Sequence, residues 1–366
     1  MRESRLDYID IHAYWQHPRF PGKPWDAGNW RIPNTPMTAA LGGDTLNRLA
    51  MHRVAGKPFT VSEYNHPAPS DYRAECMPML ASFAALQDWG GIFQFCYGAR
   101  PDDWGAAALQ SYFRMVTDPA KVAFFPVAAN LFRRGDVAMA RREARLRIGR
   151  ERVTALAAEY GNDVVGIWSK TGVARTAPTR HRVAIEWTEG DELSADSVAV
   201  PEERSVSSDT DQINWMNPED GEKMYWVETP KTQVVLGEIA DSGLSLGGDI
   251  EVEVGETETG WAAFALTSMD DLPLPESNRM LLVIMSKVEN QGMGWDEGRN
   301  TVGREWGNGP TIAEGVPARL TFGSRDDLVI YALDGTGKRA QKVEAREGSF
   351  GLGPEYRTCW YEVAAE

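Results

Sequence analysis

The sequence has few cysteines and no long apolar run. Its three cysteines among 366 residues, Cys76, Cys96 and Cys359, are an odd number in mostly apolar surroundings, which favours reduced thiols over a disulfide framework. No stretch approaches the roughly 20 apolar residues of a membrane span. The sequence also lacks the cationic segment followed by an apolar one that is typical of a signal peptide. The sequence therefore predicts no membrane partner and, by default, a cytoplasmic location.

Positive charge is scarce in the second part of the chain. Residues 1–136 carry 14 Lys and Arg against 13 Asp and Glu, which leaves 24 against 40 for residues 137–366 out of totals of 38 and 53. Such an acidic surface repels polyanions, so we expect no nucleic acid partner. Four of the five histidines precede residue 67, which concentrates titratable chemistry in the first part.

Strand and helix patterns alternate in residues 1–136. Strand-like runs at 8–15, 58–64 and 91–97 are separated or followed by helical patterns at 37–54, 72–89, 106–116 and 120–132. This order predicts an α/β domain of three β/α units, one part of a TIM-type barrel. Because a complete barrel needs about 250 residues, either another chain completes it or the parallel sheet stays open.

Short β-rich runs separated by Gly, Asp-Gly and Pro turns dominate residues 137–366. With almost no helix pattern beyond 151–160, they predict an all-β domain, a β-sandwich. The polar, acidic and Ser-rich stretch at 189–211 is expected to be a mobile loop.

Glu63 ends the apolar run 58–64 and is followed by Tyr64, Asn65 and His66. A carboxylate in such a place is costly unless it does chemistry or is well paired, and pairing with an arginine is the plain structural alternative. In the first run, Asp10 and residues 12 and 14 share one face of a strand. We expect that face to line a site, although two polar neighbours that satisfy one another would give the same pattern.

Several aromatic side chains lie near these candidates in sequence, and sugar C–H faces stack on such rings. Trp25 and Trp30, in a long loop, are the better platform candidates, whereas Trp89 is expected in the core. The histidines lack compact metal-ligand spacing, so no metal and no cofactor are expected.

The segments DYIDIHAYW, KPFTVSEYNHP and GGIFQFCYG resemble strands six, seven and eight of clan A glycoside hydrolases, which are retaining (β/α)8 enzymes. Later segments such as VETPKTQVVLGEI and GPEYRTCWYEV resemble the β-domain of large bacterial cellulase-like proteins. The resemblance implies that Glu63 is the nucleophile. It also implies that His12 and Tyr14 line the sugar subsite. The neighbouring aromatic and polar side chains complete the expected substrate-binding set: Trp15, Trp30, Tyr64, Asn65, His66 and Tyr97.

A retaining mechanism needs two carboxyl groups about 5–5.5 Å apart. The family's acid/base Glu lies on strand four and has no counterpart here. The sequence therefore predicts a glycosidase for a β-linked saccharide whose acid comes from another subunit, or from Asp10, Asp26, Asp102 or Asp103. A homo-oligomer joined at the open barrel edge is expected. The alternative is a non-catalytic carbohydrate-binding or structural remnant of a longer hydrolase; an esterase is disfavoured because no nucleophile elbow, a serine on a sharp turn from a strand into a helix, is expected.

Overall fold

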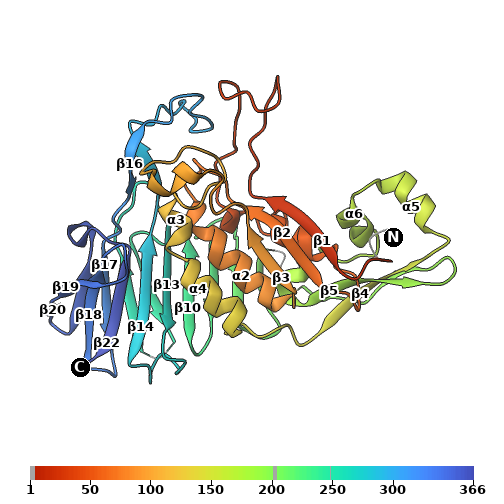
Figure 1. Cartoon of the computed structure of the whole chain (residues 1–366). Helices are drawn as coiled ribbons and strands as arrows, with labels where there is room; N and C mark the ends of the chain where they lie inside the picture. The colour runs from red at the N-terminus through yellow and green to blue at the C-terminus, as the bar shows by residue number, and fades with distance from the viewer. Residues whose placement is uncertain (1–4, 201–203, 248) are drawn as a thin grey trace.

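The computed structural model describes residues 5–200, 204–247 and 249–366. Figure 1 shows a small parallel sheet at the centre, large antiparallel sheets on one side and a second small sheet with its helices on the other. Between residues 5 and 366, outside the two gaps, no helix is long and apolar enough to cross a bilayer. All three cysteines are free, as expected.

The three predicted β/α strands form one parallel sheet. β1 (Ile9–Tyr14), β2 (Phe59–Asn65) and β3 (Gly91–Gln94) lie in the order β1-β2-β3. The helices between and after them are shorter than predicted: α1 (Thr45–Ala50), α2 (Cys76–Leu86), α3 (Pro119–Val122) and α4 (Phe125–Ala129).

The helix predicted at 106–116 is absent from the structure, and this prediction is wrong. Leu109, Phe113 and Met115 of this segment are buried, but its backbone follows an irregular course with bends and turns. Backbone hydrogen bonds join Cys96 to Phe113 and Met115, and Tyr97 to residue 116, so the segment runs beside the continuation of β3. Tertiary pairing has overridden the helical period.

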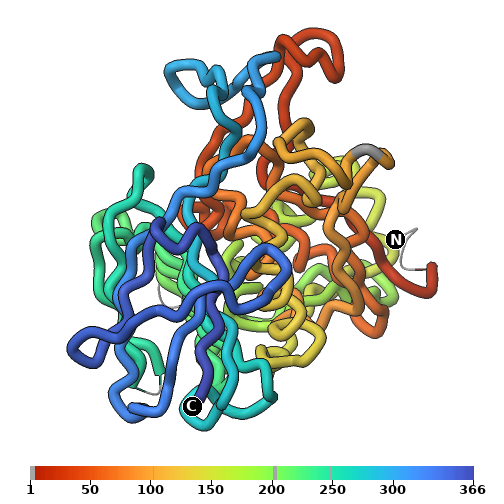
Figure 2. Tube along the Cα trace, turned by 60° about the vertical axis from the view of Figure 1, so that its left-hand side comes forward, coloured from red at the N-terminus to blue at the C-terminus, as the bar shows by residue number. Residues whose placement is uncertain are grey.

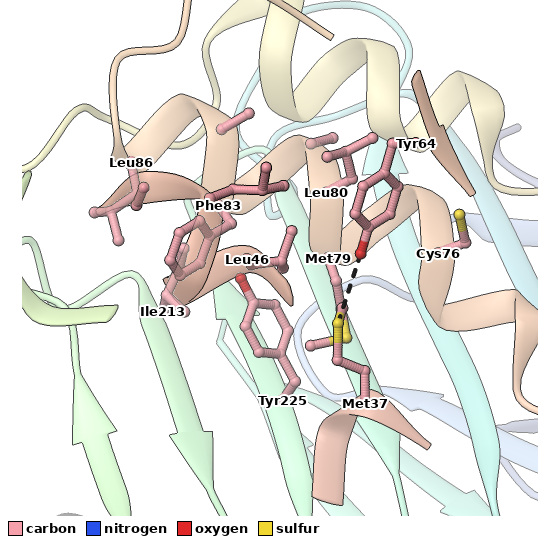
Figure 3. Close-up of a cluster of buried hydrophobic side chains, with 14 of the residues drawn as sticks. Met37, Leu46, Tyr64, Cys76, Met79, Leu80, Phe83, Leu86, Ile213 and Tyr225 are labelled. Atoms are coloured by element: carbon pink, nitrogen blue, oxygen red, sulfur yellow. Dashed lines mark hydrogen bonds between the residues drawn. The ribbon is translucent and has the colours of Figure 1, made fainter. Parts of the chain in front are cut away.

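Helix α2 is buried on all sides because it lies between two sheets. Its residues pack against the parallel sheet and against the large antiparallel sheet, where the Ser82 hydroxyl lies 2.8 Å from the Tyr225 hydroxyl. Figure 3 shows the buried side chains between the two sheets, among them Phe83 of α2 with Leu46, Tyr64 and Tyr225. The α/β part and the β part therefore share one core.

Residues 143–195 form a small α/β unit apart from the two large sheets. β4 (Glu143–Gly149) pairs in parallel with β5 (Arg182–Thr188) and antiparallel with β6 (Leu193–Ala195). Between β4 and β5 lie α5 (Val153–Tyr160), α6 (Val164–Lys170) and α7 (Ala177–Arg180). The all-β portion, which the sequence placed from residue 137, thus starts after this unit, since two of these helices are too short to give a sequence period.

Two antiparallel sheets and a hairpin make up the all-β portion, as predicted. The nine-stranded sheet has the order β19-β18-β22-β14-β13-β10-β9-β8-β7, the five-stranded sheet has the order β11-β12-β17-β21-β20, and β15 pairs with β16. Their bounds are β7 (Ser205–Ser207), β8 (Ile213–Met216), β9 (Met224–Glu228), β10 (Thr232–Gly237), β11 (Ser242–Leu246), β12 (Ile250–Val254), β13 (Ala262–Ser268), β14 (Arg279–Met285), β15 (Val288–Gln291), β16 (Asn308–Ala313), β17 (Ala318–Phe322), β18 (Leu328–Leu333), β19 (Arg339–Val343), β20 (Ala345–Arg346), β21 (Ser349–Leu352) and β22 (Trp360–Ala365).

Alternation along β13 explains why the nine-stranded sheet is buried on both faces. Ala262, Phe264 and Leu266 pack toward the five-stranded sheet. Ala263 and Ala265 face the core that contains α2. Part of the predicted mobile loop at 189–211 is also strand, because β6 and β7 fall within it, while residues 201–203 lie outside the described residues.

A long loop from each part of the chain projects from the same side of the molecule. Residues 16–36, after β1, lie beside residues 292–307, which join β15 to β16, and Figures 1 and 2 show the two loops together. Trp30, Ile32 and Val302 form a small apolar core between them.

Candidate functional site

A β-bulge in β2 places two consecutive side chains on one face of the parallel sheet. Asp10 aligns with Thr60 and His12 with Glu63, so β2 advances three residues where β1 advances two. The pairing of β2 with β3 carries the same extra residue. Ser62 and Glu63 therefore point the same way, toward β1's polar side chains, although strict alternation would separate them.

Glu63 is bound by two side chains from β1. The Tyr14 hydroxyl donates to Glu63 Oε2 at 2.5 Å, and His12 Nδ1 lies 3.4 Å from the same oxygen. Burial, together with the hydrogen bond and the charge of Glu63, raises the pKa of Tyr14, which keeps its hydroxyl protonated as a donor. The predicted grouping of His12 and Tyr14 with Glu63 is thus confirmed as geometry.

Asp10 lies on the same face and is held by β2. Its carboxylate accepts from Thr60 Oγ1 at 2.6 Å, from Ser62 Oγ at 2.5 Å and from the Ser62 backbone N–H at 3.1 Å. Burial acts to raise the pKa of Asp10, but these hydrogen bonds and nearby His12 outweigh it and lower the pKa. Asp10 is therefore an ionised group that positions its neighbours, and it does not suit the role of acid.

Ser62, His12 and Glu63 contact one another in the order found in serine hydrolases. Ser62 Oγ lies 2.9 Å from His12 Nε2, and His12 Nδ1 faces Glu63. Asp10, however, takes the only proton of the Ser62 hydroxyl, and the Ser62 N–H is bonded to it as well. A negative charge forming on Ser62 Oγ would meet the Asp10 carboxylate, so the arrangement does not suit a serine nucleophile.

The face that carries these groups is open to solvent. The Phe93 side chain, on β3, is 58% exposed, and the side chains of His12 and Glu63 are 51% and 32% exposed. Parallel sheets are normally covered on both faces. Here the covered face is the opposite one, where Val61 and Tyr64 are buried against the α2 layer.

Tyr64, Asn65 and His66 do not contact Glu63 at this site, although their place next to it in the sequence suggested that they would. All three are buried, and the Tyr64 hydroxyl lies 3.0 Å from His66 Nε2 on the covered side. Asn65 Nδ2 donates to the carbonyl groups of Phe95 and Phe113. Tyr64 leaves Glu63's face because the strand resumes its alternation immediately after the bulge. Asn65 is aligned with Tyr14 and is buried where it bonds to these two carbonyl groups.

The aromatic candidates also divide. Trp30 is 1% exposed and belongs to the core of the projecting loops, so it is no platform. Trp15 is partly buried and donates through Nε1 to the Thr35 carbonyl at 2.9 Å. Tyr97 is exposed and packs against exposed Trp104, with ring centroids 5.3 Å apart. Trp25 is 60% exposed and, as predicted, presents its ring to solvent.

The aspartates considered as acids have other roles. Asp103 is buried, pairs with Arg114 and accepts from the backbone N–H groups of Ala99 and Arg100. Asp26 accepts from the Gly28 N–H and lies 3.6 Å from Arg304. The side chain of Asp102 lies outside the described residues.

Sequence reasoning missed Thr60, Ser62 and Phe113, which complete the surroundings of Tyr14 and Asp10. Phe113 packs on the Tyr14 ring at 4.9 Å. The bulge has no residue signature such as a glycine, so only the pairing of the strands reveals it.

No cluster of three or more metal-ligating side chains occurs in the described parts of the chain. Comparisons with protein-family models, with curated proteins and with solved structures found no match to this chain.

Proposed function

We propose that this chain carries the nucleophile of a retaining glycoside hydrolase acting on a β-linked saccharide, on β/α units that belong to a TIM-type barrel. The observation that carries the proposal is the 2.5 Å hydrogen bond from the Tyr14 hydroxyl to Glu63 on an open sheet face. Both His12 and Tyr14 contact Oε2, and no donor of the described residues hydrogen-bonds to Oε1. Oε1 is then the oxygen available for attack.

In the proposed reaction, Glu63 Oε1 forms a bond to the anomeric carbon while the bond from that carbon to the leaving oxygen breaks. A second carboxyl group donates its proton to the leaving oxygen. The same group, now a carboxylate, takes a proton from water, whose oxygen attacks the anomeric carbon and releases Glu63. The Tyr14 hydroxyl holds Glu63 ionised and oriented throughout.

We propose that a second copy of the chain supplies the second carboxyl group. The open face of the parallel sheet supports this, because covering it would bury Phe93 and bring new side chains to Glu63. Beside β1, a groove of about 430 Å³ lined by Ile9, Ile11, Ile185 and Trp187 offers further apolar surface at the barrel edge. Sedimentation should show a dimer or larger assembly at micromolar concentration, and a stable monomer would contradict this step.

The alternative is a protein that binds carbohydrate without cleaving it. It is favoured by the roles of Asp10 and Asp103, which are each fixed by several donors and do not suit proton transfer. In that case the open face binds sugar and Glu63 is a hydrogen-bond acceptor for its hydroxyls.

Aryl β-glycosides with a dinitrophenyl leaving group separate the two functions, because such a leaving group needs little protonation. We expect burst release of the phenol by the wild-type protein and a loss of about a thousandfold or more in Glu63→Gln. The matched control is Glu186→Gln, whose side chain is 31% exposed and lies on the small mixed sheet. Activity that survives Glu63→Gln would remove Glu63 as nucleophile, and no activity in the wild type would favour binding alone.

A further inference from the structure

We infer that the β15–β16 loop of the all-β portion is a working part of the cleft. Through Arg299 it fixes the 16–36 loop and so presents Trp25 as a stacking platform for an oligosaccharide bound next to Glu63. The substrate class rests on the proposed function, whereas the brace and the platform stand on contacts of their own.

Trp25 is joined to Glu63 by a row of rings. The Trp25 ring lies 5.6 Å from that of His17, and the His17 ring lies 5.3 Å from that of Tyr14, whose hydroxyl binds Glu63. Phe113 packs behind the row, 6.3 Å from Trp25. Trp25 is still 60% exposed, so these contacts hold it while leaving much of the residue open to solvent.

The backbone of Trp25 needs outside support. Its φ is 61°, in the left-handed region, which is strained for a bulky residue. A strained residue in an exposed loop stays in place only where the surrounding structure holds it. Support on one side comes from Phe20, whose ring lies 5.1 Å from that of Trp25.

The brace is centred on Arg299. Its guanidinium donates to both oxygens of Asp71, at 2.9 and 2.6 Å, and to Glu289 at 3.0 Å, while lying 4.5 Å above the Trp295 ring. Asp71 in turn accepts from Asn34 Nδ2 at 2.9 Å, and the Asp71 N–H donates to Asn34 Oδ1 at 2.8 Å. Arg299 thus links the β15–β16 loop to the end of the 16–36 loop through the segment after β2.

Backbone contacts extend the same connection. The Ile32 N–H donates to the Asn300 carbonyl at 2.8 Å, and Trp30 Nε1 donates to the Gly303 carbonyl at 3.0 Å. Trp30 also stacks on Trp306 at 5.8 Å. Figures 1 and 2 show the two loops close to each other on the same side of the molecule. Trp30 is therefore the buried anchor of the loop that carries Trp25.

The ligand class follows from the surface offered. An exposed indole beside hydroxyl-binding groups suits a sugar ring, whose C–H face stacks while its hydroxyls bond to polar neighbours. Because Trp25 is separated from Glu63 by Tyr14 and His17, it serves a sugar unit other than the one attacked. Trp25 variants should therefore lose affinity for oligosaccharides.

Binding of cellohexaose, xylohexaose and mannohexaose, measured by calorimetry on the full chain in the Glu63→Gln background, tests the inference. We expect at least one to bind, with Kd raised at least fivefold by Trp25→Ala and at least twofold by Arg299→Lys, since lysine lacks the bidentate fork and the stacking plane. The matched control is Arg325→Lys, which removes a similar bidentate pair with Asp327 far from the loops and should leave Kd unchanged.

Each outcome decides a separate point. An unchanged Kd in Trp25→Ala, or no binding of any hexasaccharide, overturns the platform. A Kd that is raised in Trp25→Ala but unchanged in Arg299→Lys overturns the brace. A Kd raised as much in Arg325→Lys as in Arg299→Lys also overturns the brace, because the loss is then not specific to Arg299. Tight binding sensitive to Trp25, with no cleavage of aryl glycosides, leaves the platform standing and refutes the proposed hydrolase.

Discussion

The two faces of the parallel sheet carry the same kinds of side chain in opposite surroundings. On the covered face, His66 Nδ1 lies 3.4 Å from Glu75, and both side chains are within 1% of complete burial. On the open face, His12 Nδ1 lies 3.4 Å from Glu63, and both are accessible. Two His–Glu pairs of equal distance therefore have different roles: the buried pair belongs to the packing, and the accessible pair can contact a ligand.

On the covered face, the Glu75 carboxylate is satisfied by neighbouring backbone groups. Glu75 accepts from the N–H groups of Met37 and Thr38 at 2.6 and 3.2 Å, which ties the segment before α1 to the start of α2. Burial lowers the pKa of His66, so its ring is held neutral. The comparison predicts that changes on the covered side act on stability and that changes on the open side act on function.

The largest effect is expected from Asp118→Ala, in the buried layer next to α2. Asp118 pairs with Arg73 at 2.7 Å and with Lys121 at 3.1 Å, and all three side chains are almost completely buried. Removing the carboxylate leaves two buried cations unpaired, which should cost about 3–5 kcal/mol of unfolding free energy in urea titrations. Asp327→Ala, at a half-exposed pair, should cost far less, because solvent screens exposed charges; equal losses would contradict the contrast.

The next effect is a pH dependence set by His52, which lines the groove beside β1. Burial first, and then nearby Arg48, lower the pKa of His52 to about 4 from an ordinary value of 6.5. Between these values the unfolded chain binds a proton that the folded chain excludes, so stability should fall as pH drops from about 6.5 to 4. The loss is on the order of 3 kcal/mol. Thermal unfolding of His52→Gln should show a flatter profile, and an identical one would refute this role.

A smaller effect is expected from Asp10→Asn on the open face. The pKa of Asp10 lies below its ordinary value of 3.8, so its contribution is present above that pH and is lost as pH falls further. Exchanging charge-assisted bonds from Thr60 and Ser62 for neutral ones should cost about 1 kcal/mol near neutral pH. Urea titrations at pH 7 and pH 3 should show the difference from wild type shrinking at pH 3; a constant difference would contradict the assignment.

Much of the fold was predictable because local pattern and tertiary structure agree. The three parallel strands and the antiparallel portion follow from alternation and turn residues. The helix prediction for 106–116 failed because the same spacing of apolar residues also suits an irregular segment that packs one side against the core. The α/β unit at 143–195 was not predicted because α6 and α7 are stabilised by contacts with residues distant in sequence. One such contact is the hydrogen bond from Trp168 Nε1 to the Met51 carbonyl.

The candidate site was predictable in part for a similar reason. Co-facial Asp10, His12 and Tyr14 follow from the period of a strand, which β1 obeys. The bulge in β2 breaks that period at Ser62, so strict alternation put Glu63 on the opposite face from Ser62 and could not show that the two lie together. The role of Arg299 depends on a contact with Asp71 across 228 positions of sequence, which no local pattern encodes.

The smallest stability effect belongs to Glu63→Gln, and this variant sharpens the comparison most. The Glu63 side chain is 32% exposed, and glutamine keeps an oxygen that accepts the Tyr14 proton, so unfolding free energy should change by about 0.5 kcal/mol or less. A residue that serves packing behaves in the opposite way: Glu75→Gln, buried beside His66, should lose more than about 1 kcal/mol. Urea titrations of both variants therefore complement the glycoside assay. A loss in Glu63→Gln as large as that in Glu75→Gln would mean that Glu63 is a structural carboxylate, and a low activity of that variant would then not identify a nucleophile.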